Sequence, residues 1–104
     1  MEEKAEAIEL RGMIVSDLHL EKENDFLQVS DMDLLKERLV DVINHLLQHD
    51  YAQLINAMYR LDIDEKLFRE AISGMHSPNV ASRLADLVIR RELEKIQSRK
   101  KYKS

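Results

Sequence analysis

Two short patterns in this chain place metal-ligating residue types at a useful spacing. In the stretch MIVSDLH, an apolar run ends in Asp17 and His19, a carboxylate and an imidazole two positions apart. His45 and His49 are four residues apart, which lets two imidazoles on one helix reach the same metal ion. The zinc-protease form of that pair has Glu directly after the first His, where this chain has Leu46. We therefore expect the two histidines to pack and hydrogen-bond at the edge of an apolar face, without a metal ion.

The stretch MIVSDLH, residues 13–19, resembles the first metal-binding motif of the calcineurin-like metallophosphoesterases. The resemblance implies that Asp17 and His19 would hold one ion of a two-metal site, with a second Asp bridging to the other ion. That family also has Gly-Asp, Gly-Asn-His and Gly-His motifs further along. Here Gly12 and Gly74 are both followed by Met, so the remaining ligands are missing. We expect Asp17 and His19 to be surface residues of an N-terminal helix that do no chemistry.

The acids Asp62, Asp64 and Glu65 have the pattern of a calcium loop, but an EF-hand loop needs Gly at its sixth position. This chain has Leu67 there, and we expect the acids to cap helices instead. The 104 residues include two glycines and no cysteine. This composition excludes glycine-rich phosphate loops, disulfides, thiolate zinc sites and a cysteine nucleophile. The sequence therefore predicts no enzyme active site and no cofactor.

Helices must position these residues, because two glycines and one proline are too few for the tight turns of a sheet protein. Apolar residues recur at the helical spacing of three and four positions, most clearly over 31–49. We expect a single domain over 1–104 with an all-α fold, a compact irregular bundle of four to five helices. Two long helices, over 31–49 and 78–99, form its frame. The predicted core is Leu35, Leu39, Val42, Leu46, Leu54, Met58, Phe68, Ile72, Leu84, Leu87 and Val88.

Helix boundaries follow from residues that satisfy the unpaired end groups of a helix. Ser and Asp accept hydrogen bonds from the first N–H groups. Pro fits the first helical position, and Gly suits the left-handed residue after a helix. The expected N-caps are Ser30, Asp50, Asp64 and Ser77, with Pro78 opening the last helix and Gly74 closing the one before it.

The N-terminal part leaves two alternatives. Apolar residues at helical spacing favour a helix over 2–23. The run Met13-Ile14-Val15 could instead be a short buried strand, because β-branched residues favour strands. The helix is preferred, since a lone strand would have no partner in a helical chain. Residues 24–30 then form a linker to the first long helix.

The last helix is apolar on two sides. One stripe contains Val80, Leu84 and Val88 and is expected to face the core. The second stripe lies on another side of the helix and contains Ile89, Leu93 and Ile96. A helix that is apolar on two sides is normally covered on two sides. The second cover is either the N-terminal segment or another copy of the chain, and we predict a homodimer with this second stripe in the interface.

Charge is spread unevenly along the chain. Residues 1–41 carry 12 acids and 5 bases, a balance of −7, whereas residues 90–104 carry 2 acids and 7 bases, a balance of +5. The acidic head and the basic tail could attract one another within one chain or between two. The basic tail is also the one candidate for anion binding, because lysines and arginines neutralise phosphates. Its residues are Arg90, Arg91, Lys95, Arg99, Lys100, Lys101 and Lys103.

Residues 51–102 resemble small helical bacterial proteins of unassigned function, through AMYRLDIDEK (57–66) and RLADLVIRRELEK (83–95). The resemblance implies a folded domain and brings no chemistry with it. We predict a non-enzymatic helical interaction or assembly module whose partner is a second copy or another protein. The alternative is a nucleic-acid accessory protein that uses the basic tail. With no export signal and no apolar run near the ~20 residues of a membrane span, we expect a cytoplasmic location, no membrane partner and no small-molecule substrate.

Overall fold

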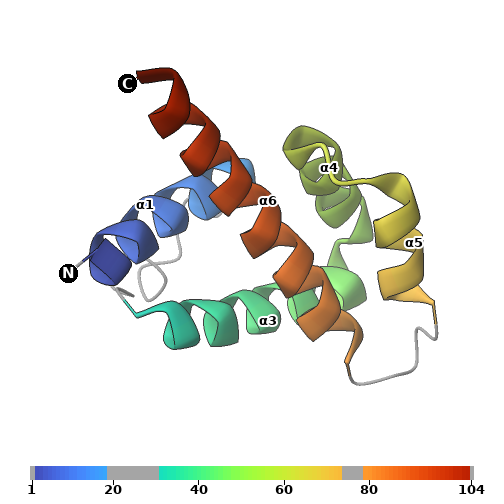
Figure 1. Ribbon diagram of the computed structural model, residues 1–104. Coiled ribbons are helices and arrows are strands. Elements are labelled where there is room, and N and C mark those ends of the chain that lie inside the picture. The colour runs from blue at the N-terminus through green and yellow to red at the C-terminus, as the bar shows by residue number, and fades with distance from the viewer. Residues whose placement is uncertain (1, 19–30, 74–78, 104) are drawn as a thin grey trace.

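The computed structural model describes residues 2–18, 31–73 and 79–103, which contain five helices and no strand (Figure 1). The all-α fold is thereby confirmed. The structure also describes side chains, for residues 7–18, 31–73 and 79–99. The helices are α1 (Glu2–Asp17), α3 (Met32–His49), α4 (Tyr51–Leu61), α5 (Glu65–Ile72) and α6 (Val80–Lys103).

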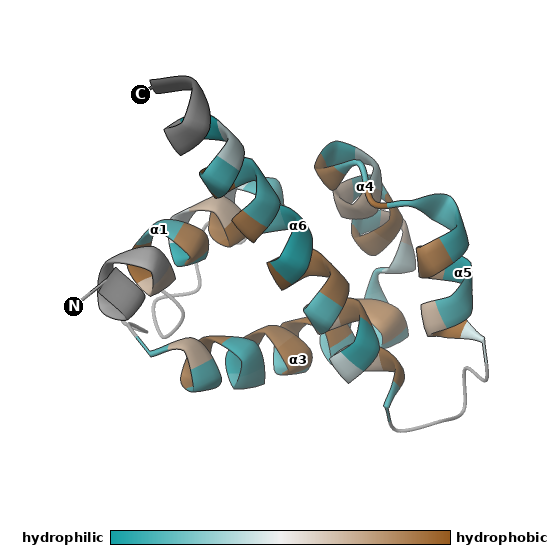
Figure 2. Cartoon of the chain, in the orientation of Figure 1, coloured by the Kyte–Doolittle hydropathy of each residue, from teal (hydrophilic) through white to brown (hydrophobic). Residues whose placement is uncertain are grey.

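Helix α6 is the common neighbour of the other helices, since it packs against α1, α3, α4 and α5. In Figure 1 it runs diagonally across the bundle, with α1 on one side and α4 and α5 on the other. Its most extensive contact is with α3, so the two long helices do form the frame. An ion pair of 2.8 Å between Lys36 Nζ and Asp86 Oδ1 joins their surfaces. Figure 2 shows apolar and polar positions alternating around the helices, the pattern of elements that bury one face.

The N-caps of α4 and α5 are the predicted ones, and the N-cap of α3 is not. Asp50 Oδ1 accepts from Gln53 N at 3.2 Å, and Asp64 Oδ1 accepts from Lys66 N at 2.8 Å. At α3 the expected cap was Ser30, but Asp31 Oδ1 accepts from Leu34 N at 3.1 Å. An aspartate serves this position at least as well as a serine, and its charge is also favourable at a helix N-terminus.

Two predicted ends differ from the structure. Helix α1 ends at Asp17 instead of residue 23, and the alternative of a strand at Met13 to Val15 is wrong. Helix α6 begins at Val80 and continues to Lys103, four residues beyond the predicted end at residue 99. The expected linker 24–30 and the expected boundary residues Ser30, Gly74, Ser77 and Pro78 lie outside the described residues.

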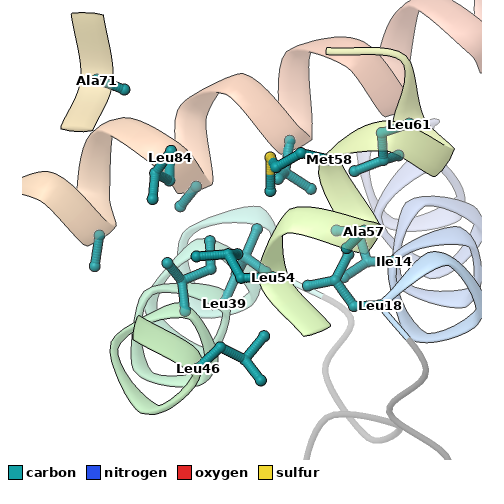
Figure 3. Packing of buried hydrophobic residues seen from close by; sticks show 14 of the residues in the cluster. Ile14, Leu18, Leu39, Leu46, Leu54, Ala57, Met58, Leu61, Ala71 and Leu84 are labelled. Atoms are coloured by element: carbon teal, nitrogen blue, oxygen red, sulfur yellow. The ribbon is translucent and has the colours of Figure 1, made fainter. Parts of the chain in front are cut away.

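The core contains side chains from every described helix (Figure 3). Of the 11 predicted core residues, 7 are buried, and Val42, Phe68, Ile72 and Leu87 are partly buried against the same cluster. On α3 the buried row continues through Ile43, one residue after the predicted Val42. Sequence reasoning missed the contribution of α1 and of the small residues that allow close helix packing. These fully buried residues include Ala7, Leu10, Ile14, Leu18, Ala57, Leu61 and Ala85.

Leu84 provides a test of this core. The side chain of Leu84 is 0% exposed, so Leu84→Ala is expected to lower the free energy of unfolding by about 2–5 kcal/mol. Asp64→Ala, which removes only the hydrogen bonds of an exposed cap, is expected to cost about 1 kcal/mol. Urea unfolding followed by circular dichroism measures both. Small and equal effects would show that Leu84 is not in the core.

Candidate functional site

Arginines from neighbouring helices close the C-terminal ends of three helices. The last carbonyl groups of a helix have no partner within it, and cations are favourable there. Arg60 Nε of α4 donates to Asp17 O of α1 at 3.0 Å. Arg83 Nη1 of α6 donates to Ser73 O at 3.3 Å, just after α5. Arg91 Nε of α6 donates to Leu61 O of α4 at 2.9 Å. The ends of these helices are thus fixed by residues far away in the sequence.

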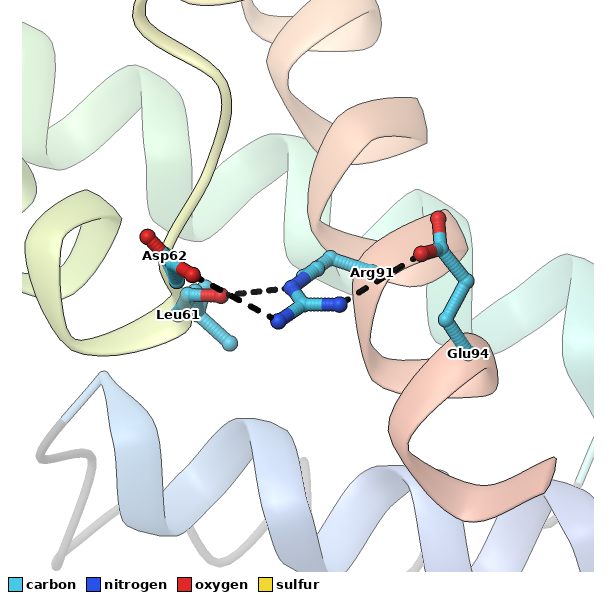
Figure 4. A network of polar contacts seen from close by, with 4 residues as sticks. All are labelled: Leu61, Asp62, Arg91 and Glu94. Atoms are coloured by element: carbon cyan, nitrogen blue, oxygen red, sulfur yellow. Dashed lines mark hydrogen bonds and ion pairs between the residues drawn. The ribbon is translucent and has the colours of Figure 1, made fainter. Parts of the chain in front are cut away.

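Arg91 is the most connected of these arginines (Figure 4). Besides the bond to Leu61 O, its Nη2 lies 3.7 Å from Asp62 Oδ2 and its Nη1 lies 3.4 Å from Glu94 Oε2. Asp62 follows α4 with a left-handed backbone, φ 59°, a conformation that Asp tolerates better than most residues. The guanidinium therefore joins α6 to the turn between α4 and α5.

Helix α1 is held at its C-terminal end by α4. Its last turn contains no basic residue. Two α4 side chains supply the missing donors: Arg60 to Asp17 O, and Gln53 Nε2 to Leu18 O at 2.8 Å. Because these bonds join residues 35 and 43 positions apart, they fix where the first helix stops against the rest of the bundle.

The main electrostatic feature of the described structure is a buried carboxyl group on α6. Glu92 is 0% exposed, and neither of its carboxylate oxygens has a hydrogen-bond partner. Burial, the largest cause, and the neighbouring side chain of Asp17 together raise the pKa of Glu92 from its ordinary 4.5 to about 8. The positive charges of Lys95 and Arg99 lower this pKa. The group is therefore protonated at neutral pH, since a buried charge without hydrogen bonds is costly.

Glu92 was missed by the sequence prediction, although a signal was present. Ile89, Glu92 and Ile96 are spaced by three and four residues, so the acid lies within the second apolar stripe of α6. In the structure Ile96 is 1% exposed, and Ile89 and Leu93 are partly buried against the core. Because α1 packs against α6 and Asp17 at the end of α1 neighbours Glu92, the N-terminal helix contributes to the cover of this stripe, which was the other predicted possibility. Ile96 is therefore not accessible to a partner.

The residues of the predicted basic tail differ in exposure, and Arg91 is bonded within the chain. Arg90 is exposed, whereas Arg91 is partly buried and bonded within the chain. Lys95 is partly buried and Arg99 exposed, and both act on the pKa of Glu92. The side chains of Lys100, Lys101 and Lys103 lie outside the described residues, although their backbone belongs to α6.

The candidate metal ligands are not assembled where the structure describes them. His45 and His49 are exposed, with ring centroids 4.7 Å apart. Asp17 ends α1, and His19 lies outside the described residues. Asp62 and Asp64 are the C-cap of α4 and the N-cap of α5, as capping predicted. Within residues 2–18, 31–73 and 79–103, no group of three or more His, Cys, Asp or Glu could hold a metal ion.

A groove between α4 and α5 is the second candidate site. Its volume is about 200 Å³, and its lining is mostly apolar, formed by Ile55, Met58, Tyr59, Ile63, Glu65, Phe68 and Arg69. Tyr59, which helps to line this groove, is 80% exposed. The other large apolar side chains described as exposed are only 39–41% exposed. The sequence carries no signal for this groove, because it depends on the angle between two short helices.

Comparison with protein-family models, with curated proteins and with solved structures gives no significant match. None of the helices in the described part of the chain combines the length and the apolar character needed to cross a membrane.

Arg91 and Arg90 make a matched pair for testing the arginine contacts. Arg91→Met removes the donor to Leu61 O, and we expect it to lower the free energy of unfolding by about 1 kcal/mol. Arg90→Met changes an exposed neighbour and is expected to stay within about 0.5 kcal/mol of the parent. Chemical denaturation measures both variants. Equal effects would mean that Arg91 does not hold α4 against α6.

Proposed function

We propose that this chain is a non-enzymatic interaction module that assembles with a second copy of itself through the groove between α4 and α5. The observation that carries the proposal is Tyr59, which stands 80% exposed beside a groove that it helps to line. Tyrosine is enriched among the residues that dominate binding energy in protein interfaces. A large aromatic surface left in water on a small domain favours a partner that covers it.

The size of the groove favours a side chain over a small-molecule ligand. Ligand pockets typically have volumes of about 300–1,000 Å³, whereas this groove has about 200 Å³. Its walls are formed mainly by the apolar side chains of Ile55, Ile63 and Phe68, with charged residues at Glu65 and Arg69. One aromatic side chain presented by another protein matches this combination of size and lining.

The same patch is self-complementary, which favours a second copy as the partner. A two-fold interface brings the same surface together from both subunits. Here one patch holds both a projecting side chain, Tyr59, and a groove. It also holds one acid and one base, Glu65 and Arg69, whose Oε1 and Nη2 atoms lie 3.9 Å apart. In a two-fold dimer, Tyr59 of each copy enters the groove of the other, and the two charges face opposite charges.

Tyr59→Glu tests this dimer. Sedimentation equilibrium of the parent is expected to give the mass of a dimer, because burial of the two tyrosines favours association. Tyr59→Glu places a charge in the apolar contact and is expected to give a monomer with unchanged helical circular dichroism. The control is Tyr51→Glu, the same substitution on the same helix at a residue that does not line the groove; it is expected to remain dimeric.

Three results would contradict the proposal. One is a parent protein that stays monomeric at the highest concentration at which it is soluble. The second is a dimer that survives Tyr59→Glu, since this would place the interface elsewhere on the surface. Dissociation by Tyr51→Glu and Tyr59→Glu alike would also count against the groove, because it would show a general effect of added charge.

A further inference from the structure

Helix α6 presents a carboxyl group to α1 inside an otherwise apolar contact. Glu92 is 0% exposed, and it lies on α6 between Ile89 and Ile96 in the stripe that α1 helps to cover. The neighbouring carboxyl group is that of Asp17, the last residue of α1. The end of a helix is itself negative, because its last carbonyl groups point away from it. Three sources of negative potential therefore meet at this point.

A single proton resolves the conflict between these groups. Both oxygens of Glu92 lack a hydrogen-bond partner in the structure. If Asp17 and Glu92 were both ionised, neither could donate a hydrogen bond to the other. When one of them carries a proton, the two side chains can hydrogen-bond to each other. A carboxyl pair that shares one proton is the usual solution for two acids that cannot both ionise at close range.

The cations around the pair do not replace this proton. Lys95 and Arg99, on the same helix as Glu92, lower its pKa, but less than burial and Asp17 raise it. Arg60, from α4, donates its Nε proton to the backbone oxygen of Asp17. Arg11, a partly buried residue of α1, is not among the groups that shift the pKa of Glu92. None of these groups donates a hydrogen bond to the carboxyl oxygens of Glu92.

We propose that Asp17 and Glu92 hold one proton at the contact between α1 and α6, and that loss of this proton releases α1 from the bundle. At neutral pH the proton is bound only while α1 is docked, because after release both carboxyl groups are solvated and far apart. Release uncovers the apolar face of α1, including Leu10 and Ile14, and the stripe of α6 that contains Ile96. The surface that sequence reasoning assigned to a dimer interface is then exposed under alkaline conditions.

The direction of the pH effect follows from the shift at Glu92. Its pKa is about 8 in the folded chain, against 4.5 when solvated. Below about pH 4.5 both states bind the proton, and α1 is fully docked. As the pH rises from about 4.5 to about 8, the released state loses its proton first, so docking weakens steadily. Above about pH 8 both states are ionised, and the weakening is complete.

Thiol labelling of α1 tests the proposal, because the chain has no cysteine of its own. Ala7, on α1, is 0% exposed, so Ala7→Cys introduces a thiol that reacts only when α1 is released. The labelling rate is divided by that of the same thiol in urea-unfolded chain, to remove the effect of pH on thiol reactivity. Ala71→Cys is the control, since Ala71 is buried at 5% exposure on α5, a helix that packs against α6.

The opening equilibrium at Ala7→Cys is expected to rise at least about tenfold between about pH 6 and about pH 9, while that at Ala71→Cys rises much less. Adding Glu92→Gln, which keeps the shape and cannot ionise, should abolish the rise. Should this variant fail to fold, Asp17→Asn serves instead: it removes one charge and supplies an amide donor, so the rise should be smaller.

Several outcomes would overturn the proposal. A rise that persists in both the Glu92→Gln and the Asp17→Asn variants would show that other groups control α1. An equal rise at Ala71→Cys would mean that the whole chain unfolds and that α1 is not released on its own. Labelling that responds to added Mn²⁺ and is insensitive to pH would show that the pair binds a cation instead of a proton.

Discussion

Every helix described in this bundle depends on contact with one element, α6, which packs against all the others. A helix in that position cannot keep a single apolar face, because it must meet neighbours on several sides. Some polar side chains consequently lie within helix contacts. Each of them must find a hydrogen-bond partner there or lose its charge. Arg83 and Arg91 do so by donating to the carbonyl groups that end α5 and α4. Glu92, fully buried, does so by remaining neutral beside Asp17.

The contacts at helix ends explain how short helices keep their places. Helix α5 has 8 residues, which is below the length at which an isolated helix is stable in water. Its N-terminus is capped by Asp64 and its C-terminal end by Arg83. The end of α4 is fixed by Arg91, and the end of α1 by Arg60 and Gln53. Arg91 and Arg83 thus bond the ends of α4 and α5 to α6, and the groove beside Tyr59 lies between these two short helices.

The parts of the fold that could be predicted are those determined by neighbours in the sequence. Helical spacing gave α3 and most of α6, and local capping gave the starts of α4 and α5 at Asp50 and Asp64. The two-sided apolar character of α6 was also visible, but not which segment covers it. That choice, the burial of Glu92 and the exposure of Tyr59 depend on how helices cross. Contacts such as Arg91 to Leu61, 30 positions apart, have no local pattern.

The charge state of Glu92 in the folded chain can be measured directly. The side-chain carboxyl carbon of a ¹³C-labelled chain reports ionisation directly by NMR, and comparison with Glu92→Gln assigns its signal. We expect a titration midpoint of about 8 for Glu92, well above the values of solvated glutamates. A midpoint near 4.5, the ordinary value for the group, would show that Glu92 is solvated and that α1 does not cover it.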